Sequence, residues 1–325
     1  MSNNLNLNKA KEIKNDEWYT KMTDISYELS LYKEQLSNKK IICPCDWDES
    51  FDEKVVYDSF ELVSRKELNL FGESNATIKN INTDATNKNL KNSSERKCGF
   101  ITFLSQVAND WNIKSVSASG YDPNTDKGVK FQDIDYSKYD VVITNPPFSC
   151  FREFIEILLK YPNLSFIVIG PIGAYSYKEF FNYLKSNKIW NGYTQPKGFI
   201  DPFGVEKKFG NICWWTNLDV SYRHEKIKME YSYYESPSNY PKYDNYDAIE
   251  VNKIKNIPYD YEGLMGVSGA TFLSRFNPSQ FELLGTTASL GFSKGRPYIN
   301  GLRKFDRLII KNKFPVKKQE QQYEY

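Results

Sequence analysis

The chain has 325 residues, of which 40% are hydrophobic and 26% are charged, and its formal net charge is +2. This composition is typical of a folded globular protein and excludes a largely disordered chain. The length is sufficient for one large α/β domain or for a catalytic core with a smaller module. The nearly neutral total neither requires nor excludes a nucleic-acid partner, because a basic groove can lie within a balanced surface.

Several further classes of protein or site are disfavoured. No apolar run approaches the length of a membrane span, and the polar N-terminus ‘MSNNLNLNKAKEIKNDEW’ lacks the apolar stretch of a signal peptide. Five scattered cysteines predict no disulfide framework and favour the reducing cytoplasm. His224 is the sole histidine, so we expect neither a metal site nor histidine-based acid–base catalysis.

The N-terminal part of the sequence begins with helical periodicity. Residues 8–37 predict a helix, because apolar residues from Trp18 to Leu29 recur at helical spacing. Residues 41–42 predict a short strand, which leads into the polar turn ‘CPCDWD’. Between residues 51 and 97 the pattern weakens, and we expect an insertion or a mobile surface loop.

Strands and helices alternate after this segment. Strands are expected in ‘IKSVSASGYD’, ‘DVVITNPPF’ and ‘LSFIVIG’, and helices in ‘GFITFLSQVANDW’, ‘FREFIEILLKY’ and ‘SYKEFFNYLKSNKIW’. Such alternation predicts a mostly parallel sheet with helices on both faces, in which ligands bind beyond the carboxyl ends of the strands. Because the later sequence is rich in Tyr, Lys, Asn and Pro, we expect a catalytic domain over 1–219 and a second region over 220–325, of which a part could return to the catalytic sheet.

The stretch ‘YDVVITNPPFSCF’ carries the clearest chemical signal. A strand through residues 141–143 runs into Asn145-Pro146-Pro147-Phe148, where two prolines remove two backbone donors and stop both strand and helix. The Asn145 side-chain oxygen and the Pro146 carbonyl are placed to accept hydrogen bonds from an exocyclic amine, which favours the geometry in which its lone pair attacks. Phe148 offers a ring on which an extruded base stacks. The alternative is a structural turn that happens to contain two prolines.

This motif resembles the (D/N/S)-P-P-(Y/F) signature of amino-methyltransferases that use S-adenosylmethionine, in the Asn-Pro-Pro-Phe form that suits adenine at N6. The whole chain resembles the EcoRI-type adenine-specific DNA methyltransferase family. The segments that carry the resemblance follow the family's order: ‘NDEWYTKMTDI’, ‘CPCDWD’, ‘DVVITNPPFSCFREFIEILLKY’, ‘SYKEFFNYLKSNKIWNGY’, ‘NICWWTNLDV’, ‘YPKYDNYDAIEVNKIKNIPYDYEGLMGV’ and ‘TFLSRFNPSQFEL’. The resemblance implies a Rossmann-like α/β methyltransferase fold with a C-terminal target-recognition region.

The resemblance also implies a set of cofactor-binding residues. Carried over by position, they are Tyr19 and Thr20 at the methionine end of S-adenosylmethionine, Cys43 and Asp46 in the loop beneath it, Tyr121 or Asp122 at the ribose, Asp133 at the adenine amino group, and Asn145. Each has a structural alternative: Asp46 could cap a helix, Tyr19 could be a core residue, and Asp133 could be a turn residue with Asp135 as its rival. The loop from Cys43 to Asp46 lacks the glycines that many methyltransferases have there.

Double-stranded DNA is the partner that the resemblance implies. Basic residues near the expected cleft are Lys188, Lys197, Lys207, Lys208, Arg223, Lys226 and Lys228, of which Lys197, Lys207, Lys208 and Arg223 are our foremost candidates for phosphate contacts. We expect a monomeric, site-specific DNA adenine-N6 methyltransferase without metal or membrane association, either in a restriction–modification system or as an orphan or phage enzyme. The alternatives are an RNA or protein-glutamine methyltransferase with the same motif, and a non-catalytic nucleic-acid-binding protein.

Overall fold

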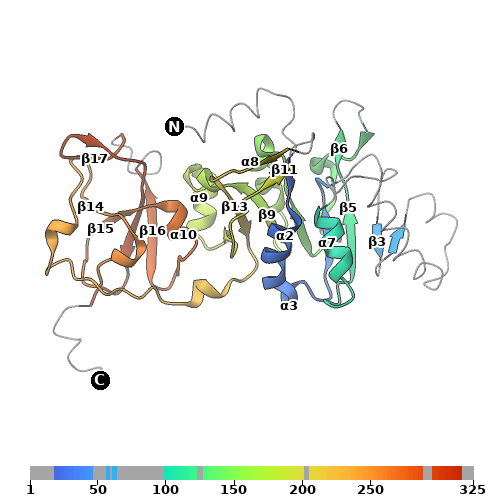
Figure 1. Ribbon diagram of the computed structural model, residues 1–325, viewed down its shortest axis with the longest axis horizontal. Coiled ribbons are helices and arrows are strands. Elements are labelled where there is room, and N and C mark those ends of the chain that lie inside the picture. The colour runs from blue at the N-terminus through green and yellow to red at the C-terminus, as the bar shows by residue number, and fades with distance from the viewer. Residues whose placement is uncertain are drawn as a thin grey trace, which may run out of the picture. The chain divides into compact units, whose positions relative to one another are not determined.

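The computed structural model describes residues 18–46, 56–58, 61–63, 99–122, 127–200, 205–287 and 295–316 (Figure 1). The chain divides into two compact units. The first comprises Met1–Pro171 and Gly192–Leu218, and the second comprises Ile172–Asn191 and Asp219–Tyr325. The second unit therefore includes a segment before residue 192 that we had expected within the first domain.

A single large sheet forms the framework of the first unit, with strand order β13-β9-β8-β2-β5-β3-β4. Strands β9, β8, β2 and β5 are parallel to their neighbours within this group, whereas β13 is antiparallel to β9, and β3 to β5 and β4. The bounds are β2 (Lys40–Cys43), β3 (Val56–Asp58), β4 (Glu61–Val63), β5 (Ser115–Ala118), β8 (Val141–Thr144), β9 (Ser165–Pro171) and β13 (Ile212–Thr216). The fold is therefore mixed α/β, as expected.

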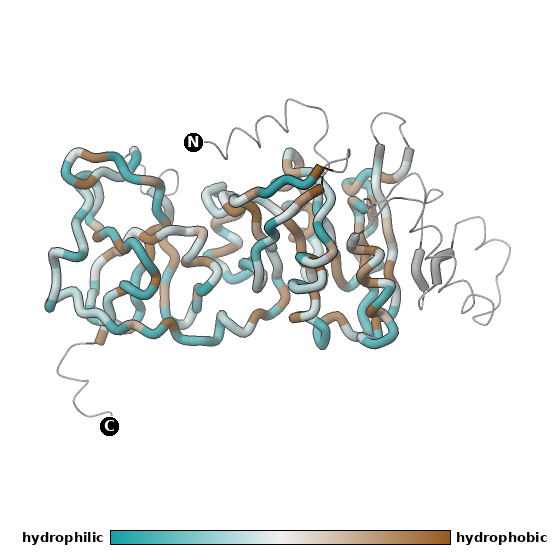
Figure 2. Tube along the Cα trace, viewed as in Figure 1, coloured by the Kyte–Doolittle hydropathy of each residue, from teal (hydrophilic) through white to brown (hydrophobic). Residues whose placement is uncertain are grey.

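The order of the central strands creates a switch point beside β2. The chain passes from β2 to β5 on one side and later returns to β8 and β9 on the other. In open α/β sheets, ligands bind at the carboxyl ends of the strands on either side of such a reversal. All residues of β8 and β13 are buried, as in strands covered on both faces. Figure 2 shows the hydrophobic residues gathered along these strands.

The helices of the first unit bury their apolar faces, as the periodicity predicted. In α8, Phe151, Phe154, Ile155 and Leu158 are all buried at the spacing of one helix face. Among its described residues, this unit has the helices α2 (Met22–Leu29), α3 (Lys33–Leu36), α7 (Gly99–Val107) and α8 (Phe151–Leu158).

The predicted helix over residues 8–37 is wrong at Tyr19–Thr20, and its residues 8–17 lie outside the described part of the chain. Tyr19–Thr20 forms a strand, β1, and helix α2 begins only at Met22. Strand β1 pairs antiparallel with β11 (Phe199–Ile200), which in turn pairs with β12 (Glu206–Lys207). An aromatic and a β-branched residue suit this strand, and their distant partner overrides the helical periodicity.

The expected insertion over residues 51–97 is described only at β3 and β4, which add to the edge of the main sheet. The rest of that segment lies outside the described residues. A small ribbon of β6 (Tyr121–Asp122) and β7 (Lys127–Gly128) follows β5.

The second unit has its own sheet, with strand order β14-β15-β19-β16. Its strands are β14 (Ala248–Val251), β15 (Leu264–Val267), β16 (Phe281–Thr286) and β19 (Leu308–Asn312). The unit also contains α9 (Lys178–Lys185), α10 (Gly269–Leu273), β10 (Trp190–Asn191), and the hairpin of β17 (Tyr298–Ile299) and β18 (Leu302–Arg303). In the part of the chain that the structure describes, no helix is long and apolar enough to cross a membrane.

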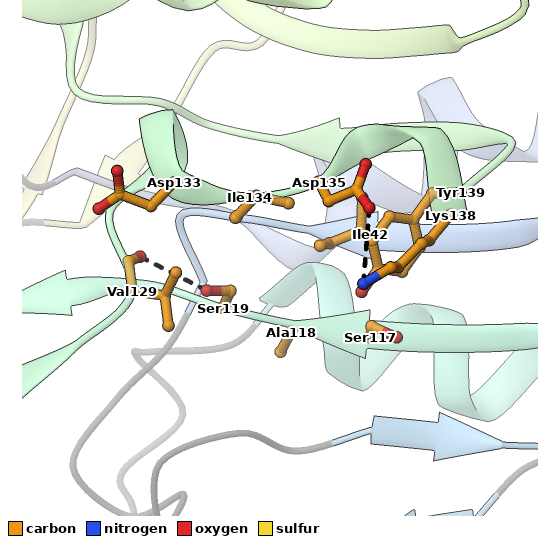
Figure 3. Close-up of a pocket in the computed structure, with 10 residues that line it drawn as sticks. All are labelled: Ile42, Ser117, Ala118, Ser119, Val129, Asp133, Ile134, Asp135, Lys138 and Tyr139. Atoms are coloured by element: carbon orange, nitrogen blue, oxygen red, sulfur yellow. Dashed lines mark hydrogen bonds and ion pairs between the residues drawn. The ribbon is translucent and has the colours of Figure 1, made fainter.

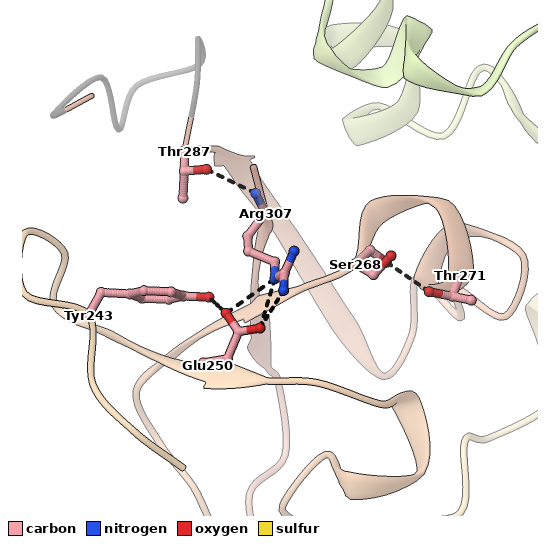
Figure 4. A network of polar contacts seen from close by, with 6 residues as sticks. All are labelled: Tyr243, Glu250, Ser268, Thr271, Thr287 and Arg307. Atoms are coloured by element: carbon pink, nitrogen blue, oxygen red, sulfur yellow. Dashed lines mark hydrogen bonds and ion pairs between the residues drawn. The ribbon is translucent and has the colours of Figure 1, made fainter. Parts of the chain in front are cut away.

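A buried ion pair joins two parts of this second sheet (Figure 4). Glu250 of β14 is 2% exposed, and its carboxylate accepts hydrogen bonds from Arg307 Nε at 2.9 Å and Nη2 at 2.5 Å. The hydroxyl of Tyr243 donates to the same carboxylate, and the backbone N–H of Arg307 donates to Thr287 Oγ1 at 2.9 Å. These bonds compensate the buried charges, and they fix the backbone at Arg307, just before β19.

Candidate active site

The Asn-Pro-Pro-Phe segment lies at the carboxyl end of β8. The strand ends at Thr144, a 3-10 turn spans Phe148–Cys150, and α8 begins at Phe151. The two prolines stand between strand and turn, where neither can donate to a ladder. The sequence prediction of a buried strand, a stiff turn and an amphipathic helix is confirmed, and Asn145 lies at the carboxyl edge of the sheet.

The side chain of Asn145 is fixed by one hydrogen bond and leaves one group unused. Its Nδ2 donates to the backbone carbonyl of Trp18 at 2.5 Å. Because a carbonyl oxygen only accepts, the atom that faces Trp18 must be the amide nitrogen, and the orientation of the amide follows. Asn145 Oδ1 is buried and has no hydrogen-bond partner among the described residues. A buried acceptor without a partner is costly in a folded protein, so Asn145 Oδ1 is suited to accept a hydrogen bond from a bound ligand.

Two other buried polar atoms belong to the segment whose backbone holds Asn145. Thr20, two residues after Trp18 and 8% exposed, has an Oγ1 with no hydrogen-bond partner among the described residues, and the same holds for Trp18 Nε1. Trp18 is the residue whose carbonyl holds Asn145. The site therefore offers one further donor and a hydroxyl to a polar ligand.

A row of aromatic rings connects the Asn145 turn to the small β1-β11-β12 sheet. Phe148 meets Phe199 edge-on, with ring centroids 6.3 Å apart, and Phe199 lies 5.3 Å from Phe209. Phe209 meets Trp18 edge-on at 4.8 Å. Phe148 itself is 9% exposed, so its ring lies largely within this row. A flat ligand that stacks on Phe148 must therefore use the small part of the ring that is open, or displace a neighbour.

The loops after β2, β5 and β8 are tied together at the same edge. Thr144 Oγ1 donates to Asp46 Oδ2 at 2.8 Å, and the backbone N–H of Asp46 donates to Ser119 O at 3.0 Å. The N–H of Ser119 donates to Cys43 O at 2.9 Å. Burial raises the pKa of Asp46 to about 7, although the Thr144 hydrogen bond opposes the rise.

A pocket of about 190 Å³ opens beside the carboxyl end of β5 (Figure 3). Asp133 and Asp135 both line it. Asp135 is already engaged, since its carboxylate accepts from Ser137 Oγ at 2.5 Å and pairs with Lys138 Nζ at 3.5 Å. The exposed Asp133 carboxylate lies at the far end of the pocket from Lys138 (Figure 3). Of the two rivals, the geometry favours Asp133 as the acceptor for a ligand.

The other predicted cofactor residues lie at or near this edge. Cys43 is fully buried at the end of β2, and Tyr19 pairs through its backbone with Ile200. Tyr121 is half-buried, with Lys130 Nζ 4.8 Å from the centre of its ring. Asp122 is described only by its backbone, which pairs with that of Lys127 in β7.

Two carboxylates that the sequence analysis did not single out bind the backbone of the segment that leads into β11. Asp24 and Glu28 lie one turn apart on α2. Asp24 Oδ2 accepts the backbone N–H groups of Lys197 at 2.8 Å and Gly198 at 3.1 Å. Glu28 is fully buried and accepts four hydrogen bonds, two of them from Thr194. The sequence does show two acidic residues, Asp24 and Glu28, one turn apart. Such a pair is typical of a solvent-exposed helix face, so it did not indicate that either carboxylate has a structural role.

Burial raises the pKa of Glu28, and the hydrogen bonds that it accepts oppose the rise. All four groups that face the carboxylate are donors, which favours its ionised form. These bonds fix the segment that enters β11, and through β11 they fix β1 and the carbonyl of Trp18.

The predicted phosphate-binding residues fall into two groups. Lys197, Lys207 and Lys208 are exposed, and Lys207 Nζ lies 4.9 Å from the ring centre of Trp18, beside the Asn145 turn. Arg223 is 6% exposed: its guanidinium lies 4.1 Å from the ring centre of Trp190 and donates to Asn187 Oδ1 at 2.8 Å. Burial lowers the pKa of Arg223. This packing argues against the phosphate contact that we had expected from Arg223.

The remaining lysines of the expected cleft, Lys188, Lys226 and Lys228, are exposed, and Lys228 pairs with Glu230 at 2.7 Å. Over the described ranges, no three His, Cys, Asp or Glu side chains gather in a way that could hold a metal ion.

Comparison with known proteins gives a consistent result over nearly the whole chain. Residues 6–324 match the family described as adenine-specific methyltransferase EcoRI. The Type II methyltransferase M.EcoRI of Escherichia coli is 36% identical over 94% of this chain and 96% of its own length. Type II methyltransferase M.MgeORF184P of Mycoplasma genitalium is 33% identical, and M.MpnI of Mycoplasma pneumoniae is 29% identical, each over 94% of this chain and 98% of the relative. No solved structure matches the chain significantly.

Proposed function

This chain belongs to the EcoRI family of adenine-specific methyltransferases, and from that premise we propose that it transfers a methyl group from S-adenosylmethionine to N6 of an adenine flipped out of duplex DNA. The observation that carries the proposal is the buried Asn145 Oδ1, which has no partner among the described residues at the carboxyl edge of the sheet. We assign to the main sheet the Rossmann-like arrangement of methyltransferases that use this cofactor.

Asn145 acts on the attacking nitrogen. The N6 lone pair of adenine is delocalised into the ring, which makes the amine a poor nucleophile. A hydrogen bond from N6 to Asn145 Oδ1, with a second to the Pro146 carbonyl, favours the tetrahedral nitrogen that attacks. Both acceptors are oriented before the substrate arrives, one by Trp18 O and the other by the proline ring, so little reorganisation is needed.

The residues of this edge suit S-adenosylmethionine. The exposed Asp133 carboxylate would accept a hydrogen bond from the adenine amino group in the 190 Å³ pocket, and Tyr121 or Asp122 would hold the ribose. Thr20 Oγ1, buried with no partner among the described residues, would face the methionine end beside Tyr19. Cys43 and Asp46 would form the floor of the site. When bound, the cofactor supplies a methyl carbon on a sulfonium, which makes it electrophilic.

With S-adenosylmethionine bound, the N6–carbon bond would form as the carbon–sulfur bond breaks, and the electron pair of the broken bond would stay on sulfur. The nitrogen then loses one proton to solvent, so no general base is needed before attack. The protein contributes orientation and electrostatics. Phe148 would stack on the flipped adenine, and the exposed Lys197, Lys207 and Lys208 would contact DNA phosphates. A role beside a restriction nuclease, or as an orphan or phage enzyme, is consistent with this chemistry.

The test is transfer of labelled methyl from S-adenosylmethionine to duplex DNA, RNA and protein in parallel, followed by nucleoside analysis. We expect label in duplex DNA, as N6-methyladenine. Asn145→Ala should reduce the rate roughly 10²–10³-fold, the cost of removing one preorganised hydrogen-bond group, and leave cofactor affinity within a few-fold. Asn252→Ala, an exposed asparagine of the second unit, is the matched control.

Label in RNA or in protein glutamine instead of DNA would favour the first alternative reading of the motif. Binding of DNA without transfer to any acceptor would favour a non-catalytic nucleic-acid-binding protein. If Asn145→Ala loses cofactor binding and transfer to the same extent, the substitution has disturbed folding; if it changes neither, the proposed role of Oδ1 is wrong.

A further inference from the structure

The β17–β18 hairpin of the second unit is a short, exposed antiparallel ribbon (red in Figure 1). Tyr298 pairs with Arg303, and Ile299 with Leu302. The turn between the strands is Asn300-Gly301, with φ of 51° and 72°. Positive φ at both positions is the conformation of the tight hairpin turn that Asn-Gly favours, and its twist matches that of the two strands.

Side chains outside the hairpin fix its backbone. The Asp244 carboxylate accepts the N–H groups of Asn300 at 3.1 Å and Gly301 at 2.8 Å. The Asn245 amide accepts the N–H of Tyr298 at 3.1 Å and donates to Arg296 O at 2.9 Å. The ribbon is therefore formed before any partner binds.

The hairpin is anchored in the second unit through the residue that precedes its turn. Ile299 is 6% exposed and packs in a cluster with Tyr243, Tyr246 and Ala248. Downstream, Arg307 is tied to Glu250 by the buried ion pair of Figure 4. A ribbon that is anchored on both sides loses little conformational entropy when a partner binds.

The outer surface of the hairpin is both basic and apolar. Residues 295–305 contain three basic residues, Arg296, Arg303 and Lys304, and no acidic one; the nearby Asp244 carboxylate is engaged by the two N–H groups of the turn. Arg296 and Arg303 are exposed. Leu302 is 67% exposed and Phe305 is 80% exposed. Large apolar side chains in such open positions, between arginines, point to a surface that a negatively charged partner covers.

We propose that the β17–β18 hairpin is a DNA-contacting element of this protein, with Arg303 as its principal contact. A two-stranded ribbon fits the width of the major groove of B-DNA. There an arginine pairs with phosphate oxygens or with the O6 and N7 atoms of guanine, and an apolar side chain such as Leu302 contacts a thymine methyl group. The inference rests on the proposed function only for the nature of the ligand, since the ribbon and its charge are features of the chain itself.

The test compares Arg303→Ala with Arg275→Ala, which removes an exposed arginine near α10 of the same unit. A fluorescently labelled duplex of mixed sequence is titrated with each full-length protein at several salt concentrations. Arg303→Ala should weaken duplex binding roughly 5- to 100-fold or, for a phosphate contact, lower the salt slope by about one. Arg275→Ala should leave both unchanged. The proposal is overturned if Arg303→Ala binds as the unmodified protein does, or if the control loses as much.

Arg303→Lys then identifies the kind of contact within the proposal. If Arg303→Lys binds the duplex as tightly as the unmodified protein, Arg303 contacts a phosphate. If the affinity of Arg303→Lys stays low and the variant methylates different sequences of a plasmid, Arg303 contacts a base edge. Leu302→Gln tests the protein-interface alternative: a changed oligomeric state with unchanged duplex binding would refute a DNA role. If the unmodified protein binds the duplex but methylates nothing, the proposed function is wrong. The proposal for the hairpin is not affected by that result, because it is tested by duplex binding.

Discussion

Glu28 and Thr194 lie 166 residues apart in the sequence and are joined by two hydrogen bonds, since the Glu28 carboxylate accepts the backbone N–H of Thr194 at 2.6 Å and its hydroxyl at 2.7 Å. The same carboxylate accepts the N–H of Tyr193 and the hydroxyl of Tyr32, both at 2.8 Å. A side-chain carbon on Gly192 would lie 2.1 Å from Glu28 Oε1, so only glycine permits this approach. Helix α2 thus holds the segment that leads into β11, and β11 holds β1 over the Asn145 turn.

Glu28→Gln should destabilise the protein. The glutamine amide has one acceptor oxygen and one NH2 group, so whichever way it turns, its NH2 group faces the backbone N–H of Tyr193 or of Thr194, which cannot accept, whereas the Tyr32 and Thr194 hydroxyls can turn to accept. Leaving a buried donor without an acceptor costs roughly 1–3 kcal/mol, and we expect at least that loss in the free energy of unfolding by urea denaturation. Methyl transfer should fall as well, because β11 and β1 lose their support.

Glu34→Gln, an exposed glutamate in α3, is the matched control for that measurement and should unfold as the unmodified protein does. Equal stability of the two variants would show that the four hydrogen bonds contribute nothing net.

Asp46 should make cofactor binding depend on pH near neutrality. Burial raises its pKa to about 7, so the carboxylate is ionised mainly above that pH. A positively charged sulfonium cofactor should favour the ionised form. If only that form binds, affinity falls about tenfold between pH 8 and pH 6, because the competent fraction falls by that factor. Isothermal titration with S-adenosylmethionine at these two pH values measures the difference.

Asp46→Asn should remove this pH dependence of binding. Stability should respond in the opposite direction: a raised pKa in the folded state means that Asp46 becomes less favourable to folding as pH rises from about 4 to about 7. The asparagine variant should therefore lose less stability than the unmodified protein over that window. An unchanged pH profile of binding in Asp46→Asn would assign the titration to another group.

The parts of the fold that the sequence predicted are those with a local signal. The β8 strand, its turn and α8 follow from an uninterrupted apolar run, two prolines and an i, i+3, i+4 pattern, all within a short stretch. The loop at Asp46 and the position of Asn145 at the edge of the sheet follow from the alternation of strands and helices. In each case the residues that determine the element are neighbours in the chain.

The parts that sequence reasoning missed depend on contacts between distant segments. Tyr19–Thr20 is a strand because Phe199–Ile200 pairs with it, and the sequence near Tyr19 does not indicate a partner that distant. Arg223 looked like a phosphate ligand, but it is buried against Trp190, which precedes it by more than thirty residues. The choice of Asp133 over Asp135 as the candidate cofactor ligand depends on the contacts of Asp135 with Ser137 and Lys138, which only the structure shows.

Asp133 and Asp135 should therefore separate in a cofactor-binding assay. Asp133→Ala removes the free carboxylate of the Figure 3 pocket, and we expect the dissociation constant for S-adenosylmethionine to rise roughly tenfold or more, the value of a hydrogen bond to a charged group. Asp135→Ala removes only the bonds to Ser137 and Lys138, so affinity should stay within a few-fold. The reverse ranking would identify Asp135 as the ligand.

Phe148 should be replaceable by another aromatic residue but not by alanine. Stacking of a base on an aromatic ring is worth roughly 1–3 kcal/mol, so Phe148→Ala should lower kcat/KM about 5- to 100-fold, whereas Phe148→Tyr and Phe148→Trp should stay close to the unmodified protein. Because Phe148 is 9% exposed and touches Phe199, alanine also threatens packing, and urea denaturation must accompany the kinetics. Once the methylated sequence is mapped, 2-aminopurine at the target position provides a readout that packing alone does not change. Its emission should be quenched by the stacked ring and brighter in Phe148→Ala. Equal emission in the unmodified protein and all three variants would show that the flipped base does not stack on this ring.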